Sequence, residues 1–294
     1  MQFRKRLKTG EFARLVQIDP PKGTDVITMV NNAIKVKGVV DAFLVSEMKS
    51  AVMRMTSLGA SLVLQQKGLD TIVQLSCRDR NRLALQGDLL AASALGIAAA
   101  MVVEGDPPAT GDHVDAKAVY DLTDEALVKA IASLSKGRDL AGVELAGSVD
   151  LPMGVELSTG LRGGEREKEL DRMKRMIDLG VCFFVTQPLF EFSMTEPFLK
   201  IAVKNGVTII PTVLLVKSLG MARYMARNLA HIIMPEHVID TLQKTPDKVK
   251  ASISLAVDMI HEVREMGFGG VNVSCLGWED KLPEVLGVMK GLKG

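Results

Sequence analysis

The chain has 294 residues, of which 47% are hydrophobic and only 4% aromatic, so it can bury a large and mainly aliphatic core. Its 36 lysines and arginines against 35 aspartates and glutamates leave a net charge of +1, which argues against nucleic-acid binding and an acidic disordered tail. Three isolated cysteines and a basic start without an apolar segment behind it predict a cytoplasmic protein with no metal site, signal peptide or membrane contact.

Short apolar runs alternate along the chain with longer helical patterns. Continuously apolar strands are typical of parallel sheets that are buried on both faces. The predicted strands cover residues 15–18, 42–46, 72–76, 100–104, 142–146, 183–186, 208–213 and 270–274. Eight β–α units predict an α/β protein with a single (β/α)8 barrel, a TIM barrel, as one domain over residues 1–294. An open doubly wound sheet is the alternative.

Several helices have recognisable ends. Asp79 is predicted to cap a helix that Gly96 ends, and residues 165–179 and 246–266 form two further predicted helices. The long stretch 217–269 holds at least two helical patterns, which predicts an extra helix between strands seven and eight. No GxGxxG motif follows a strand and no P-loop occurs, which disfavours a separate dinucleotide-binding domain.

Polar residues follow most of the predicted strands, and the carboxyl ends of barrel strands form one mouth where the chemistry takes place. These residues are Gln17, Asp19, Ser46, Glu47, Gln74, Ser76, Glu104, Asp106, Glu144, Gln187, Lys217, Asn272 and Ser274. Amides can pair with a planar heterocycle, and carboxylates act as acids or bases when burial raises their pKa. Taken singly, each is equally explained as a helix cap or a solvated loop group.

Four segments, in chain order, resemble bacterial 5,10-methylenetetrahydrofolate reductases of the short type. They are residues 19–25 after the first strand, 74–90 across the third β–α unit, 104–108 after the fourth strand and 185–188 on the sixth. The resemblance implies a (β/α)8 barrel that binds FAD without a Rossmann domain. It also implies a flavoprotein oxidoreductase of one-carbon metabolism, in which reduced FAD passes a hydride to methylenetetrahydrofolate and gives 5-methyltetrahydrofolate.

The same resemblance assigns roles to single residues. Asp106 is expected near the flavin and the pterin ring of the folate, and Gln187 is expected to bind the pterin. The residues that match flavin-lining positions are Ser46, Gln74, Gly105 and Tyr120, with Arg175 near the phosphate or ribose. The expected partners are a reduced folate, NAD(P)H or an electron-delivering subunit, and further copies or subunits in a homo- or hetero-oligomer.

One position departs from the family. Relatives usually carry a glutamate where this chain has Gln17, and that glutamate is taken as the general acid that opens the five-membered ring of the substrate. An amide keeps the shape but cannot donate the proton. Three explanations stay open: Asp19 or Glu47 supplies the proton, the chain is a paralogue with another task, or it is an engineered inactive form.

Two other functions fit the same residues. One is a subunit that binds flavin or folate without reducing the substrate itself, and the other is a folate-dependent methyl-transfer barrel without flavin. Restored turnover in Gln17→Glu favours a disabled reductase. A colourless protein that binds methyltetrahydrofolate favours the methyl-transfer barrel.

Overall fold

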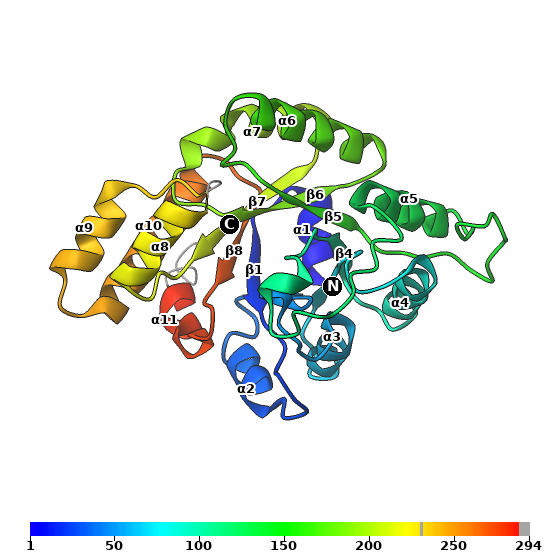
Figure 1. Ribbon diagram of the computed structural model, residues 1–294, viewed down its shortest axis with the longest axis horizontal. Helices are drawn as coiled ribbons and strands as arrows, with labels where there is room; N and C mark the ends of the chain where they lie inside the picture. The colour runs from blue at the N-terminus through cyan, green and yellow to red at the C-terminus, as the bar shows by residue number, and fades with distance from the viewer. Residues whose placement is uncertain (230–231, 288–294) are drawn as a thin grey trace.

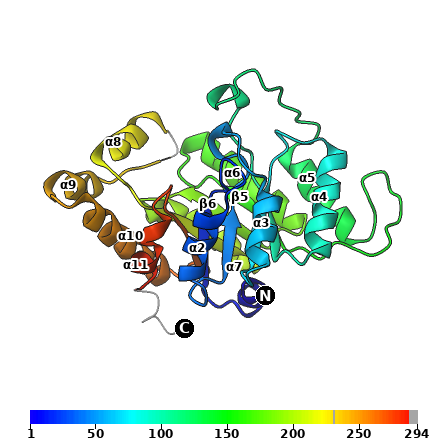
Figure 2. The ribbon, with the colours of Figure 1, turned by 90° about the horizontal axis from the view of Figure 1, so that it is seen from below.

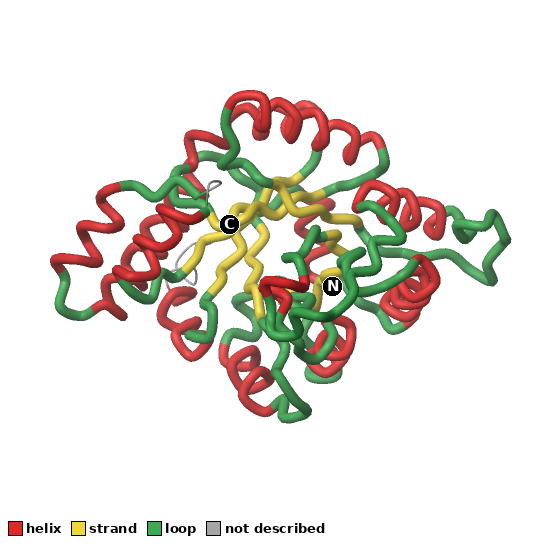
Figure 3. The backbone as a smooth tube through the Cα atoms, viewed as in Figure 1, coloured by secondary structure: helices red, strands yellow, loops and turns green. Residues whose placement is uncertain are grey.

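Eight parallel strands close into a barrel in the order β1 to β8, in a computed structural model that describes residues 1–229 and 232–287. Figures 1 and 3 show these strands at the centre with the helices around them. The strands are β1 (Ala13–Ile18), β2 (Ala42–Val45), β3 (Thr71–Leu75), β4 (Ala99–Val102), β5 (Met153–Leu157), β6 (Phe183–Pro188), β7 (Thr208–Leu214) and β8 (Gly270–Ser274). The closed barrel confirms the predicted fold and excludes the open sheet.

Helices connect the strands and cover their outer faces. They are α1 (Gln2–Thr9), α2 (Ile27–Lys35), α3 (Ser57–Gln65), α4 (Arg82–Ala94), α5 (Asp124–Ser135), α6 (Gly163–Asp178), α7 (Glu196–Asn205), α8 (Leu219–Asn228), α9 (Glu236–Lys244), α10 (Lys248–Glu265) and α11 (Leu282–Gly287). Three of them, α8 to α10, lie between β7 and β8 and group on one side of the barrel (Figures 1 and 2). This confirms the extra helical structure predicted there.

The strands separate two apolar clusters because successive side chains point to opposite faces. Leu15, Ile72 and Val185 belong to the cluster inside the barrel, and Val16 and Val73 to the cluster between strands and helices. Aliphatic side chains therefore fill the lower layers of the barrel as a packed core, not a pore. The mouth of the barrel is therefore the place where a ligand can bind.

Helix α1 was not predicted from the sequence. Its Phe3 is fully buried in the inner cluster and packs edge-on against Phe183, with the ring centroids 5.1 Å apart. Arg4, next to it, forms an ion pair with Asp150 at 2.7 Å. The basic residues of this segment therefore remain at the surface while one aromatic ring anchors the helix under the barrel.

The predicted fifth strand is wrong. Residues 142–146 form a loop, in which Gly142 and Gly147 have φ angles of +85° and +107°. The Asp139 side chain accepts hydrogen bonds from the amides of the loop, and Glu144 is exposed and pairs with Arg138 at 2.7 Å. Glu144 therefore does not belong to the barrel mouth.

The true fifth strand escaped prediction because two of its inward positions are not apolar. At Gly154, a Cβ would lie 2.2 Å from the ring of Phe183, so only glycine fits beside that ring. Two residues further on, Glu156 interrupts the apolar run at the level of the mouth. The local pattern thus looks weaker than that of residues 142–146, although the register with β4 and β6 is regular.

Helix α4 is capped by Asn81, not by Asp79. The Asn81 side chain accepts hydrogen bonds from the amides of Leu83 and Ala84, both at 3.1 Å. Asp79 instead pairs with Arg78. The other predicted helices at residues 165–179 and 246–266 agree with α6 and α10 to within about two residues, the usual uncertainty of helix ends.

Candidate functional site

The inward positions of the strands turn polar at their carboxyl ends, above the aliphatic core. Alternation from the inner apolar cluster places these residues on the mouth side of the barrel, except for Gln187, which lies in an irregular part of β6 near its carboxyl end. They are Gln17, Ser46, Gln74, Ser76, Glu156, Gln187, Thr212, Asn272 and Ser274. The mouth therefore combines amides, hydroxyls and one carboxyl group, which is the chemistry of a site for a polar heterocycle.

Gln17, Ser46 and Asp19 form one hydrogen-bonded chain at the mouth. The Nε2 of Gln17 donates to the Oγ of Ser46 at 3.0 Å, and this hydroxyl donates to Oδ1 of Asp19 at 2.7 Å. The structure thus brings together three residues that the sequence analysis selected. Asp19 acts as an acceptor in this chain.

Glu47 is engaged with its own surroundings. Its carboxylate accepts from the amide of Ser57 at the start of α3, at 3.0 Å, and from Arg80 at 3.2 Å. Burial raises the pKa of Glu47, and the Arg80 charge and these hydrogen bonds partly offset that effect. The Glu47 amide donates to Oε1 of Gln74 at 3.3 Å. Glu47 therefore caps a helix and positions Gln74.

A buried arginine ties together the loops that follow β2, β3 and β4. Arg78 is 1% exposed, and its Nε and Nη2 donate to the two carboxylate oxygens of Asp79 at 2.7 and 2.6 Å. Two of its other donors reach the carbonyl oxygens of Asp106 at 2.9 Å and Met48 at 3.3 Å. Four of the five N–H donors of this guanidinium are thus used within the protein, and they fix the backbone that carries Asp106.

The turn before Asp106 requires a glycine. Gly105 has a φ of +77°, and a Cβ there would lie 3.0 Å from Ser76 Oγ and 3.2 Å from Arg78 Nη1. The Asp106 side chain itself is exposed at the rim. Tyr120 is also exposed, and its amide donates to the carbonyl oxygen of Cys77 at 3.0 Å. Three residues that the sequence analysis selected thus lie around the loops that Arg78 organises.

Two amides in the mouth have buried oxygens without partners. Asn272 is fully buried, and its Nδ2 donates to Thr212 Oγ1 at 3.0 Å, while its Oδ1 has no partner within the described residues. Oε1 of Gln187 is likewise buried and unpaired there. An unpaired buried acceptor costs about 1–3 kcal/mol. Such acceptors are explained when a ligand supplies the missing donors.

Glu156 is the mouth residue that the sequence analysis missed. It is half-buried on β5, and its pKa is raised from 4.5 to about 7, first by burial and then by the charges of Asp106, Glu104 and Asp124, against the opposing effect of Arg172. A charged residue near the carboxyl end of an apolar strand was the signal that could have revealed it. A carboxyl group that titrates near neutral pH suits acid–base chemistry.

The pKa of Glu156 makes the stability of the protein depend on pH. Because the folded-state pKa lies above the ordinary 4.5, the folded state binds this proton more tightly than the unfolded chain. The resulting stabilisation is complete below pH 4.5 and is lost as the pH rises through about 7. Glu156→Gln, which imitates the protonated form, is therefore expected to be more stable than the wild type at pH 8, by at most about 3 kcal/mol.

Thermal unfolding at pH 5 and pH 8 measures this difference. The exposed Glu144→Gln is the matched control and is expected to unfold like the wild type at both pH values. Equal stabilisation of Glu156→Gln at the two pH values would show that Glu156 is not protonated near neutrality.

Two predicted site residues lie apart from these groups. Arg175 is on the exposed face of α6, where its Nε is 3.4 Å from a carboxylate oxygen of Glu125 on α5. Lys217 follows β7, and its Nζ lies 5.4 Å from the ring centroid of Trp278. Neither contacts the amides of the mouth through a hydrogen bond or ion pair within the described chain.

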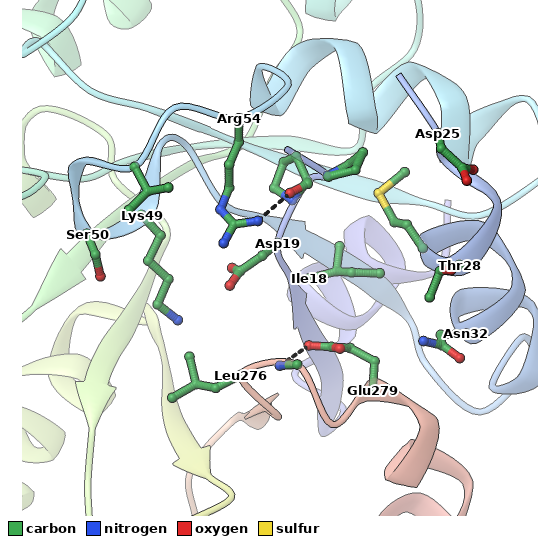
Figure 4. A pocket seen from close by; sticks show the side chains of 15 residues that line it. Ile18, Asp19, Asp25, Thr28, Asn32, Lys49, Ser50, Arg54, Leu276 and Glu279 are labelled. Atoms are coloured by element: carbon green, nitrogen blue, oxygen red, sulfur yellow. Dashed lines mark hydrogen bonds between the residues drawn. The ribbon is translucent and has the colours of Figure 1, made fainter. Parts of the chain in front are cut away.

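A cavity of about 470 Å³ opens beside Asp19 (Figure 4). Its walls come from α2 and from the loops after β1, β2 and β8. Lys49 and Arg54 bring positive charge, and three carboxylates, those of Asp19, Asp25 and Glu279, bring negative charge. Leu276 adds an apolar wall, and Arg54 donates to the carbonyl oxygen of Pro20 at 3.0 Å. Figure 4 shows the side chains of Asp19 and Lys49 directed into this space. The cavity is large enough for an extended part of a ligand whose ring lies in the mouth.

Within residues 1–229 and 232–287, no group of three or more His, Cys, Asp or Glu side chains is arranged to hold a metal ion. In the same residues, every helix is too short or too polar to span a bilayer.

Comparisons with known proteins agree with this geometry. The family model described as methylenetetrahydrofolate reductase matches residues 2–290. A Caenorhabditis elegans protein described as a probable methylenetetrahydrofolate reductase (NADPH) is 25% identical over 192 residues, which are 64% of this chain and 26% of that protein. The chain thus matches about a quarter of the length of this curated relative.

Solved structures share the fold at low sequence identity. An uncharacterised Clostridium thermocellum protein that binds two copies of 5-methyl-5,6,7,8-tetrahydrofolic acid has a TM-score of 0.69 and 15% identity, covering 99% of this chain and 98% of its own. EDTA monooxygenase from Chelativorans sp. BNC1 has a TM-score of 0.61 and 10% identity, covering 96% and 94%. These matches show the barrel fold alone.

Proposed function

This chain belongs to the methylenetetrahydrofolate reductase family, and from that premise we propose that it reduces 5,10-methylenetetrahydrofolate to 5-methyltetrahydrofolate with a hydride from a bound flavin. The observation that carries the proposal is the pair of unpaired buried acceptors, Gln187 Oε1 and Asn272 Oδ1, in a polar barrel mouth. The pterin ring of a folate offers amino and ring N–H donors for such oxygens.

Folate binding is the better supported half of the proposal. Gln187 and Asn272 come from β6 and β8, and Asp106 stands at the rim on the other side of the mouth. A carboxylate there can accept two N–H bonds from the edge of a pterin. The Clostridium thermocellum protein with the same fold binds 5-methyltetrahydrofolate. The cavity beside Asp19 then accommodates the part of the folate beyond its ring, with Lys49 and Arg54 facing its carboxylates.

The residues on β2 to β4 fit the ring of a flavin. Gln74 is 8% exposed, and its Nε2 donates no hydrogen bond within the described residues. Gly105 presents bare backbone at the turn after β4. An isoalloxazine ring carries donors and acceptors along its edge, which Gln74, Ser46 and this backbone can satisfy. Family resemblance adds Tyr120 and Arg175 as candidates for the remainder of FAD, although Arg175 must leave its ion pair to reach it.

In this proposal, the side chains of the mouth bind and orient the two ligands. A flavin bound there would supply hydride for the methylene carbon of the folate. Gln187 and Asn272 hold the pterin, and Asp106 orients its edge. Gln17 donates a hydrogen bond to Ser46 and keeps this corner of the mouth in place, but it has no proton to give. The electron donor is NAD(P)H or a partner subunit, and the site is proposed for a cytoplasmic enzyme that assembles as an oligomer.

Gln17 also favours a second candidate, a subunit that binds flavin and folate without reducing the folate itself. Both functions require folate and flavin binding, and turnover distinguishes them: only the reductase is expected to reoxidise its reduced flavin with methylenetetrahydrofolate. Calorimetric titration of the purified protein with 5-methyltetrahydrofolate tests folate binding. The visible absorbance of the same sample tests flavin binding. The proposal expects saturable folate binding and a yellow protein, and absence of folate binding contradicts both candidates.

A further inference from the structure

We propose that Glu156 supplies the proton that opens the five-membered ring of the substrate, in place of the acid that is absent at Gln17. The proposal rests on the reductase function proposed above. It concerns a residue on a different strand from the one that carries the acid in relatives, and it follows from the inward position of Glu156 on β5 and from the contacts of the carboxyl groups after β1 and β2.

The alternatives to Glu156 are occupied. The amide of Gln17 cannot donate a proton at the pH of turnover. Asp19 accepts the hydroxyl of Ser46 at 2.7 Å, and Glu47 accepts the Ser57 amide and pairs with Arg80. The carboxylate oxygens of Asp19 and Glu47 are therefore already engaged by donors of the protein.

The carboxyl group of Glu156, in contrast, has no partner among the described residues. Within the described residues, its carboxyl group makes no hydrogen bond and no ion pair. The nearby Arg172 is taken up by Glu169, with bonds of 2.7 and 2.8 Å, and its other contact is to the Glu156 backbone carbonyl at 2.6 Å. A carboxyl group in this position keeps its proton available for a ligand.

Burial favours the protonated form of Glu156, and three nearby carboxylates act in the same direction against Arg172. Glu104 and Asp106 face it from the loop after β4, Asp124 from the start of α5, and Arg172 from α6. Three carboxylates thus oppose one guanidinium, and burial in the barrel adds to their effect. The pKa of about 7 is where a general acid works best at neutral pH.

The register of the sheet places Glu156 beside the proposed pterin position. Glu156 pairs with Val185 of β6, and Gln187 is two residues further along that strand. The pairing of β6 with β7 is irregular between Val185 and Pro188, so the assignment of Gln187 to the pterin rests on its buried, unpaired Oε1 and not on strand alternation. A folate held by Gln187 therefore comes next to this carboxyl group.

The proposed step is the opening of the five-membered ring by proton transfer from Glu156. The Glu156 carboxyl group gives its proton to N10 of methylenetetrahydrofolate, the bond between N10 and the methylene carbon breaks, and its electron pair stays on N10. The methylene carbon, now an iminium carbon on N5, accepts the hydride and becomes the methyl group. Glu156 remains as a carboxylate and regains its proton from water at the mouth.

The test uses the flavin-loaded full chain, reduced under anaerobic conditions and mixed with methylenetetrahydrofolate between pH 5.5 and 8.5. The wild type is expected to reoxidise more slowly above pH 7. Glu156→Gln is expected to react about 100-fold more slowly and to lose this pH dependence. Glu156→Asp keeps a carboxyl group and is expected to recover part of the rate, while Glu144→Gln behaves like the wild type.

Two measurements besides activity accompany the kinetics. Calorimetry with 5-methyltetrahydrofolate is expected to give the same affinity for Glu156→Gln and the wild type, which shows that the variant is folded and binds. Carbon-13 NMR of the glutamate carboxyl groups is expected to show one resonance that titrates near pH 7 in the wild type and is missing from Glu156→Gln.

The outcomes separate this inference from the proposed function. A wild type that binds folate and reoxidises, with an unchanged rate and pH profile in Glu156→Gln, overturns the inference and leaves the function standing. Loss of the pH dependence in Asp19→Asn instead also overturns it. A wild type that binds no folate overturns both.

Discussion

Replacing Arg78 by methionine is expected to lower the free energy of unfolding by about 3 kcal/mol and to weaken folate binding at the mouth. Methionine fills a similar volume, so the loss comes from charge and hydrogen bonds. Asp79 loses both of its guanidinium bonds, and the carbonyl oxygens of Asp106 and Met48 lose their donor. Breaking a buried pair by removing one partner typically costs 3–5 kcal/mol, and the partial exposure of Asp79 keeps the value near the lower end.

Urea denaturation and calorimetry with 5-methyltetrahydrofolate measure the two effects. Arg138→Met removes an exposed arginine from its pair with Glu144 and is the matched control, with an expected change below about 0.5 kcal/mol. An Arg78→Met variant as stable as this control would show that the guanidinium does not hold the loops of the mouth together.

Replacing Gln187 by leucine is expected to weaken binding of 5-methyltetrahydrofolate by about 10- to 100-fold. Leucine has nearly the shape of glutamine but neither donor nor acceptor. In the wild type, the buried Oε1 has no partner in the protein, so its burial cost is offset only when a ligand donates to it. The free protein is therefore expected to be as stable as the wild type, or slightly more so, while the complex is weaker.

Calorimetry of the folate complex and thermal unfolding of the free protein distinguish these two effects. Gln243→Leu, on the exposed face of α9, is the control for the change of residue type. Unchanged affinity in Gln187→Leu would place the pterin elsewhere in the mouth.

Much of the architecture follows from local sequence patterns. Residues 42–45 and 99–102 are continuous apolar runs between helical patterns, and such runs fold as buried parallel strands because both of their faces are covered. Gly180 and Gly267 end long helices in the left-handed conformation that glycine adopts without strain. These features depend only on neighbours in the chain.

The sequence-based predictions were wrong where contacts with residues far away in the chain determine the local structure. The loop at residues 142–146 is as apolar as a strand, but two glycines with positive φ turn it away from the sheet. Asp79 and Asn81 both suit a helix cap, and the buried Arg78 draws Asp79 away from that role. Helix α1 depends on Phe3 reaching Phe183 across the barrel. No pattern within eight residues contains this information.

The residues of the candidate site likewise include some that local patterns predicted and some that only the fold brings together. The strand-end pattern selected Gln17, Asp19 and Ser46, and the structure joins them by hydrogen bonds. Glu156 was missed because its strand was misplaced, and its raised pKa depends on carboxylates from β4 and α5 that only the fold assembles. The roles assigned to Asp106, Gln187 and Arg175 by resemblance remain predictions for the experiments above.

Transfer of a hydride from a reduced flavin in this barrel to methylenetetrahydrofolate is the central claim. Its most direct test is an anaerobic single-turnover experiment on the wild-type chain, loaded with FAD and chemically reduced, in which flavin absorbance and the folate product are followed together. The account predicts reoxidation of the flavin with an equal amount of 5-methyltetrahydrofolate formed. A flavin that stays reduced in the presence of bound methylenetetrahydrofolate would contradict it.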